Sequence, residues 1–163
     1  MDPHHIDTPH GTRTRETKKA SIVVLDPSPI SLLALAGVLH SQSYECICAR
    51  NGPSAIEALD MGVQDCLVCD VGDDAIEALD TLEKMRSLAG HEHLPAVLIA
   101  ESRWAGLEKK TEQMKQATRC LFKPIDPNAL IAVVNQLLWM PSLISTHRRR
   151  GSVPSKPGWV TLN

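Results

Sequence analysis

The sequence predicts an α/β fold, a five-stranded parallel sheet with helices on both faces. Between Ala20 and Pro141, five short apolar runs alternate with five segments of helical pattern, which is typical of parallel strands joined by crossover helices. Three of the apolar runs end in a charged residue or lead into one: Asp26, Asp70 and Lys123. The carboxyl ends of parallel strands share one edge of the sheet, so these three side chains are expected to lie together.

The first two strands are expected at 21–26 and 45–49, where apolar residues with β propensity run together. Between them, Ser28 is expected to cap a helix and Pro29 to occupy its first turn. The side chains expected on the inward face of that helix are Ile30, Leu33, Ala34, Val38 and Leu39.

The third strand is expected at 65–70, between two further helices. Asn51 and Gly52 indicate a turn, after which Pro53 opens the first of these helices. The residues expected to face the core are Ala55, Ile56 and Leu59 in the first helix, and Ile76, Leu79, Leu82 and Met85 in the second.

The rest of the domain contains two more strands, expected at 94–100 and 119–122, with a more polar helix at about 103–116 between them. Asp126 then caps the last helix and Pro127 begins it. The apolar residues of this helix follow the spacing of one helical face: Leu130, Val133, Val134, Leu137 and Leu138.

One domain is expected at 19–141, because 163 residues are enough for one core with tails. Residues 1–18 are polar and are predicted to be a disordered tail. Pro141 is expected to end the last helix, so that 142–163 form a second flexible tail.

The composition argues against several classes of protein. The net charge is −2, with acids and bases interspersed, which disfavours a nucleic-acid or membrane surface. No apolar run approaches the roughly 20 residues of a membrane span, and no secretory signal is recognisable at the N-terminus. We therefore expect a cytoplasmic protein without a DNA-binding output segment.

Cys66 and Cys69 form a C-x-x-C motif, but in a strand residues three apart point to opposite faces of the sheet. A metal site or redox pair is therefore not expected there, and the cysteines are interpreted as small apolar residues.

The three charged strand ends suggest a specific chemistry. Two carboxylates 4 Å apart repel by about 4 kcal/mol at an effective dielectric constant near 20. The Lys123 ammonium offsets part of that repulsion, and a hard cation such as Mg²⁺ offsets more. A carboxylate held in this way is suited to receive a phosphoryl group, because that transfer depends mainly on positioning and charge neutralisation. The alternative is a structural ion pair that joins strand ends.

Over about residues 19–141, the chain resembles a response regulator receiver domain of two-component signalling. The segments DCLVCD and KPIDPNAL carry the resemblance. It implies a flavodoxin-like fold, a three-layer αβα sandwich with strand order 2-1-3-4-5. It also implies that Asp70 is the phosphoacceptor and that Lys123 is the family's lysine, followed by a cis bond to Pro124. Arg86 falls where the third helix of the family often carries arginine.

The resemblance further implies a Mg²⁺ site formed by Asp26, Asp70 and Gly72. The family's second acid is replaced by Pro27, so Mg²⁺ binding is expected to be weak. Asp73 or Asp74 could compensate, although both are better placed to cap and begin the third helix.

The residues that report phosphorylation in the family are also replaced. Ala100 stands where the family has Ser or Thr, and Cys120 stands where it has an aromatic ring. The sequence therefore predicts a pseudo-receiver, a single-domain module of phosphorelay signalling that acts through protein–protein contacts with weak or absent phospho-switching. Its expected partner is a histidine kinase or another signalling protein. The expected docking face, which also allows a homodimer, is formed by the fourth helix, fifth strand and fifth helix and includes Trp104 and Cys120. Trp104 is equally well explained as a cap on the core.

Three other readings stay open. A receiver that still relays phosphoryl groups from a histidine kinase is the main alternative to the pseudo-receiver. A haloacid-dehalogenase-type phosphatase is suggested by Gly72-Asp73-Asp74, but Ser28 stands where its second acid is needed and the motif precedes Lys123. A flavin or nucleotide carrier would require a glycine-rich loop after the first strand, where DPSPIS has none. We therefore do not expect an enzyme.

Overall fold

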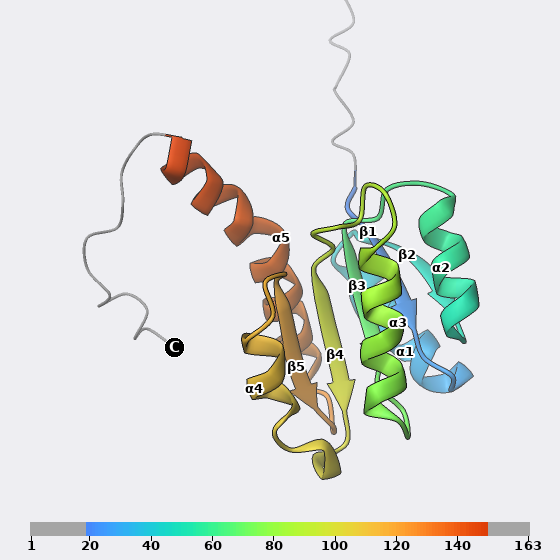
Figure 1. Cartoon of the computed structure of the whole chain (residues 1–163). Helices are drawn as coiled ribbons and strands as arrows, with labels where there is room; N and C mark the ends of the chain where they lie inside the picture. The colour runs from blue at the N-terminus through green and yellow to red at the C-terminus, as the bar shows by residue number, and fades with distance from the viewer. Residues whose placement is uncertain (1–18, 150–163) are drawn as a thin grey trace, which may run out of the picture.

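The computed structural model describes residues 19–149, with side chains described through residue 139. Five parallel strands form one sheet in the order β2-β1-β3-β4-β5, so the predicted strand order is confirmed (Figure 1). The predicted tail at 1–18 and the end of the chain from 150 lie outside the described residues. The strands are β1 (Ser21–Leu25), β2 (Glu45–Ala49), β3 (Cys66–Asp70), β4 (Ala96–Ala100) and β5 (Thr118–Phe122).

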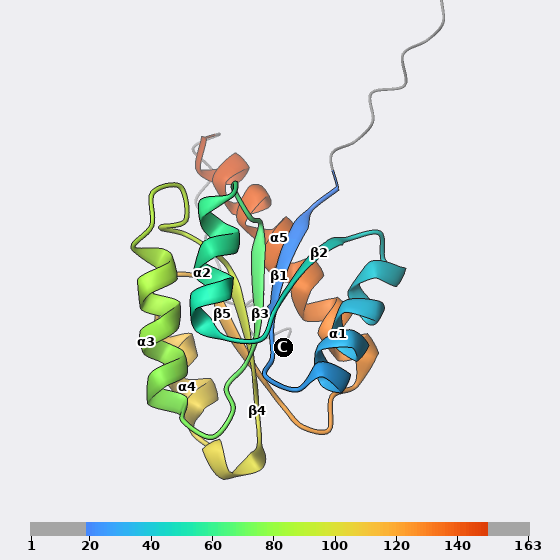
Figure 2. The same cartoon turned by 90° about the vertical axis from the view of Figure 1, so that its right-hand side faces the viewer.

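Helices cover both faces of the sheet and make the three predicted layers (Figure 2). One face carries α2, α3 and α4, and the other carries α1 and α5. The polar helix expected at 103–116 is instead a short 3₁₀ turn followed by a shorter α-helix. The helical elements are α1 (Pro29–Ser41), α2 (Gly52–Asp60), α3 (Ala75–Arg86), η1 (Ser102–Trp104), α4 (Leu107–Glu112) and α5 (Pro127–Arg149).

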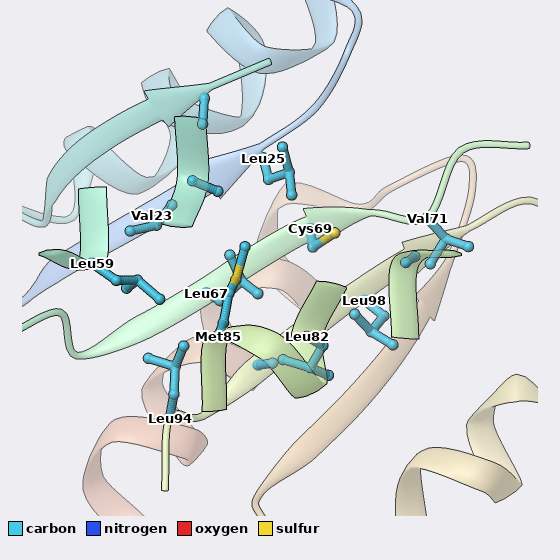
Figure 3. Packing of buried hydrophobic residues seen from close by; sticks show 14 of the residues in the cluster. Val23, Leu25, Leu59, Leu67, Cys69, Val71, Leu82, Met85, Leu94 and Leu98 are labelled. Atoms are coloured by element: carbon cyan, nitrogen blue, oxygen red, sulfur yellow. The ribbon is translucent and has the colours of Figure 1, made fainter. Parts of the chain in front are cut away.

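The core is divided by the sheet into two clusters of buried side chains. Figure 3 shows the cluster beneath α2 and α3, where Leu67, Leu82, Met85 and Leu98 pack together. The second cluster lies beneath α1 and α5. Cys69 belongs to the first cluster and Cys66 to the second, as the alternation of side chains along a strand predicts.

The predicted inward face of α1 is wrong in part. The buried residues of α1 are Leu32, Leu35 and Leu39. Of the residues predicted to face inward, Ile30 is 84% exposed, Leu33 is 75% exposed and Ala34 is also exposed. Apolar residues occur on nearly every side of this helix, so its periodicity does not choose a face. The packing of α1 against β1 and α5 determines which of its faces is buried. In α3, Ile76 is likewise exposed rather than inward.

The predicted end of the last helix at Pro141 is also wrong. Helix α5 continues through Pro141 to Arg149, and its last turns run beyond the sheet (Figure 1). A proline inside a helix removes one backbone hydrogen bond and strains one turn. In α5 that cost does not end the helix, which continues on both sides of Pro141. Residues 142–149, expected to be part of a flexible tail, are therefore helical.

A buried arginine stabilises the amino ends of β4 and β5. The Arg86 guanidinium donates to the Leu94 carbonyl oxygen at 2.8 and 3.0 Å and to the Thr118 hydroxyl oxygen at 2.8 Å. It also donates to the Ala117 carbonyl oxygen at 3.3 Å. Burial lowers the pKa of Arg86 to about 10. Within residues 19–149, none of the helices combines the length and apolarity needed to span a bilayer.

Candidate phosphoacceptor site at the carboxyl edge of the sheet

The three charged residues predicted at one edge of the sheet are close enough to interact. Asp26 directly follows β1, Asp70 ends β3 and Lys123 directly follows β5. The Lys123 Nζ atom lies 2.6 Å from Asp70 Oδ2, and the charges of Asp70 and Lys123 both act on Asp26. The predicted approach of Lys123 to Asp70 is therefore confirmed. The Lys123–Pro124 bond is cis, as the resemblance implied.

Both oxygens of the Asp70 carboxylate have a partner. Oδ2 pairs with Lys123, and Oδ1 accepts a hydrogen bond from the Gly72 backbone N–H at 2.8 Å. Gly72 has a φ of 67°, in the left-handed region that glycine adopts without strain. The Asp70 side chain is only 5% exposed, so the negative charge is held by one ammonium group and one backbone donor rather than by bulk water.

Asp26 is the less satisfied of the two carboxylates. It is 2% exposed, and its Oδ1 accepts from the Ser28 backbone N–H at 2.8 Å. Its Oδ2 is buried without any hydrogen-bond partner. Burial is the main cause that raises the pKa of Asp26, and the neighbouring Asp70 charge raises it further. The hydrogen bond to Asp70 is the main cause that raises the pKa of Lys123.

The unpartnered Asp26 oxygen fits a hydrated cation at this edge of the sheet. Mg²⁺ is commonly held by one or two carboxylates together with several waters. The residues that would hold it are Asp26, Asp70 and the Gly72 carbonyl, and its positive charge would offset the negative charge of a phosphoryl group. Within residues 19–139, whose side chains the structure describes, no three His, Cys, Asp or Glu side chains are grouped to hold a metal ion. Few side-chain ligands are therefore grouped at this edge, and the weak Mg²⁺ binding expected from Pro27 stays a prediction.

Pro27 leaves this site without a further carboxylate and brings a cation near it instead. The Pro27 carbonyl oxygen accepts from the Arg50 guanidinium at 3.2 and 3.4 Å. Pro27, Arg50, Asp70 and Gly72 all line an open pocket of about 310 Å³. The lining of this pocket is chemically mixed, because it includes both a basic residue, Arg50, and an acidic residue, Asp70.

Ala100 and Cys120 stand where the family has its switch residues, and they lie at the end of β4 and within β5. Ala100 ends β4, is buried, and its carbonyl oxygen accepts from the Lys123 backbone N–H at 2.9 Å. Cys120 is half-buried in β5 and packs against the α2–α3 side of the core. Burial raises the pKa of its thiol to about 11. Neither side chain carries a strong hydrogen-bond donor or an aromatic ring.

Sequence reasoning missed a set of contacts between the loops that follow β3 and β4. The Trp104 indole Nε1–H donates to the Gly72 carbonyl oxygen at 3.2 Å. Arg103 pairs with Asp73 at 2.6 Å and with Glu101 at 3.2 Å. The Arg-Trp pair after the fourth strand is visible in the sequence, but nothing in its spacing identifies its partners.

The remaining acids of the β3–α3 loop line the same pocket as Asp70 and Gly72 but make their polar contacts elsewhere. Asp74 caps α3, with its Oδ1 accepting from Ile76 N and Glu77 N at 3.0 Å. Asp73 is exposed and pairs with Arg103 instead of standing in the first helical turn.

A scan against protein-family models and a search of curated proteins returned no match for this sequence. Solved structures do match it. The chemotaxis protein CheY4 of Vibrio cholerae is 16% identical with a TM-score of 0.66, covering 74% of this chain and 100% of that chain. A response regulator receiver protein from Sinorhizobium medicae is 25% identical with a TM-score of 0.59, covering 74% of this chain and 95% of that chain.

A third similar structure is the receiver domain of a sensor histidine kinase from Pseudomonas aeruginosa PAO1, which has a magnesium ion coordinated in its active site cleft. It is 14% identical with a TM-score of 0.63, covering 74% of this chain and 98% of that chain. With its strand order and its two helical layers, the chain has the fold of the CheY-like response regulator receiver domains.

Proposed function

We propose that this protein is a receiver module of two-component signalling in which Asp70 is the phosphoacceptor position and phospho-switching is weak or absent. The observation that carries the proposal is the 2.6 Å ion pair between Asp70 and Lys123 beside the buried carboxylate of Asp26. The proposed domain is 19–141, and we place its action in the cytoplasm, through contacts with a histidine kinase or another signalling protein rather than through turnover of a substrate.

The charges at the site support phosphoryl transfer to Asp70. In that step an Asp70 carboxylate oxygen bonds to phosphorus while the bond from phosphorus to the donor breaks. With acetyl phosphate as donor, acetate leaves. Lys123 is placed to stabilise the negative charge on the transferred group. The same arrangement favours the second candidate, a receiver that is fully competent for phosphorelay, because the free oxygen of Asp26 is suited to a cation.

The neighbours of the site favour weak switching. A ligand shifts a conformational equilibrium only if it interacts differently with the two states. Ala100 has no hydroxyl to bond a phosphoryl oxygen, which removes a charge-assisted hydrogen bond of roughly 1.5–3 kcal/mol. Cys120 has no ring to rotate into vacated space. Lys123 remains as a contact that both states would make.

The proposed docking face is formed by α4, β5 and α5. Cys120 lies in β5 and Trp104 in η1, the turn that precedes α4, and tryptophan is a common anchor of protein interfaces. Because switching is weak, the partner is expected to bind without prior phosphorylation. A homodimer through the same face is a second proposed use of it.

The test combines phosphorylation with a readout of conformation. The protein is incubated with Mg²⁺ and acetyl phosphate, and intact mass reports addition of a phosphoryl group, with Asp70→Asn as the control. Amide NMR over residues 100–125 is then recorded with and without beryllofluoride. Small changes in the wild type support the proposal, whereas large changes there would establish a switching receiver.

A double variant separates the two defects. Pro27→Asp restores a carboxylate for the cation, and Ala100→Thr restores a hydroxyl donor. We expect the pair to recover Mg²⁺ binding more fully than the conformational response, because Cys120 still lacks a ring. Wild-type protein that saturates well below millimolar Mg²⁺, in a titration that Asp70→Asn abolishes, contradicts the weak-site proposal.

A further inference from the structure

The Gly72 carbonyl oxygen is part of the proposed cation site and is already engaged by a side chain. Trp104 Nε1–H donates to this oxygen at 3.2 Å. An indole N–H can only donate, and it turns the positive end of its dipole toward the oxygen. The oxygen keeps a second lone pair, but a cation placed there would face that positive end. The hydrogen bond and cation coordination therefore oppose one another.

The indole is held in this position from two sides. Trp104 is half-buried and packs against the α2–α3 side of the core. The Arg103 guanidinium carbon lies 5.4 Å from the centre of the Trp104 ring, within the range of a cation–π contact. Arg103 is in turn paired with Asp73 and Glu101.

Those ion pairs are exposed and contribute little individually. Most of the restraint on the loop therefore comes from the packed ring and its hydrogen bond. The Arg103 charge is balanced by Asp73 and Glu101, so the effect of this loop on a cation comes from the indole N–H rather than from a net positive charge.

We propose that Trp104 is a positioning residue for the Gly72 carbonyl, and that a cation binding to Asp26, Asp70 and this carbonyl competes with the indole and releases the segment 101–106. The inference rests on the cation site of the proposed function. It assigns to Trp104 a coupling between the acidic site and the β4–α4 segment that does not pass through Ala100 or Cys120. Because such coupling is reciprocal, loosening Trp104 strengthens cation binding.

The experiment measures Mg²⁺ binding and the environment of Trp104 on the same protein. The sequence contains three tryptophans, and Trp139→Phe with Trp159→Phe leaves Trp104 as the only reporter of fluorescence. MgCl₂ is titrated against NaCl at equal ionic strength, and amide NMR shifts near Asp70 give an independent binding curve. We expect the Trp104 emission to move to longer wavelength along the same curve as the NMR shifts, and Asp70→Asn to abolish both.

A pair of variants tests the competition directly. Trp104→Phe keeps a packed ring but removes the donor, and we expect it to bind Mg²⁺ roughly fivefold more tightly, the factor that corresponds to one neutral hydrogen bond. Trp139→Phe, which replaces an exposed tryptophan of α5, is the matched control and should leave the affinity unchanged. Arg103→Ala retains the indole while loosening it, and should tighten binding by a smaller factor.

The outcomes separate this inference from the proposed function. Mg²⁺ binding that leaves Trp104 fluorescence unchanged, or an affinity that Trp104→Phe does not raise, overturns the inference and leaves the receiver function intact. Absence of Mg²⁺ binding in both the wild type and Trp104→Phe overturns the inference together with the cation site. Phosphorylation of Asp70, read by mass, tests the receiver function separately.

Discussion

Lys123 reaches Asp70 across an intervening strand. Lys123 directly follows β5 and Asp70 ends β3, and β4 lies between these two strands. The Lys123 Nζ atom nevertheless lies 2.6 Å from Asp70 Oδ2. Their surroundings differ, because the Lys123 side chain is 38% exposed and the Asp70 side chain is 5% exposed. Asp70 therefore needs the ion pair to compensate its charge more than Lys123 does, because water also reaches the Lys123 ammonium.

Replacing Lys123 should destabilise the protein by leaving a buried carboxylate with one partner fewer. We expect Lys123→Ala to lower the free energy of unfolding at neutral pH by about 1–2 kcal/mol, since solvent screens part of the attraction at a half-exposed lysine. Urea denaturation measures the difference. Lys109→Ala, on the exposed side of α4, is the control and should change stability by less than about 0.5 kcal/mol. Equal losses in both variants would show that the pair contributes nothing specific.

Asp26 should destabilise the folded protein at neutral pH. Its pKa is raised on folding above the ordinary 3.8, chiefly by burial, so folding favours the protonated form. The associated stability is fully present below the unfolded pKa and is lost as pH rises through the folded pKa. Asp26→Asn should therefore raise the free energy of unfolding at neutral pH, by an amount on the order of 1–3 kcal/mol for one unsatisfied buried oxygen.

The pH dependence distinguishes this effect from improved packing. The advantage of Asp26→Asn should shrink as pH falls toward and below 3.8, where the wild-type carboxyl group is protonated in both states. An advantage of constant size at every pH would show that desolvation of the charge is not its cause.

Arg86 should be a costly charged side chain to remove, because its guanidinium is buried. Replacing it by Met leaves acceptors at the amino ends of β4 and β5 without their donor, and we expect a loss of about 2–4 kcal/mol in urea or thermal denaturation. Arg119→Met, at an exposed position in β5, should cost far less. Similar losses for both variants would contradict a special role for the buried guanidinium.

The five cysteines should differ strongly in reactivity toward a thiol reagent. Cys48 is exposed, whereas burial raises the pKa of Cys46 to about 11 and of Cys66 and Cys69 to about 12. Because the thiolate is the reactive form, Cys48 should react first in the native protein, and Cys48→Ser should remove the fast phase. Cys66 and Cys69 should react only on unfolding in denaturant. Rapid modification of either in the native protein would show that the sheet opens locally.

Local patterns in the sequence determined the order and type of the elements and the meeting of Asp70 with Lys123. Five apolar runs separated by helical segments are a short-range signal, and the carboxyl ends of parallel strands share an edge whatever the details of packing. Ser28 and Asp126 were assigned as helix caps for the same reason, because a cap acts within one turn. Pro141 shows the limit of such rules, since α5 continues through it.

Tertiary structure decided what local patterns leave open. Helix α1 is apolar on nearly all sides, so only its packing against the sheet and α5 determined that Ile30 and Leu33 face outward. The hydrogen bond from Trp104 to Gly72 joins two loops whose residues are 32 positions apart. No local pattern in the sequence predicts that these two residues meet. The sequence determined which groups stand at the carboxyl edge; the packing of the loops determined which of their atoms remain free, because hydrogen bonds between loops depend on positions that the whole fold sets.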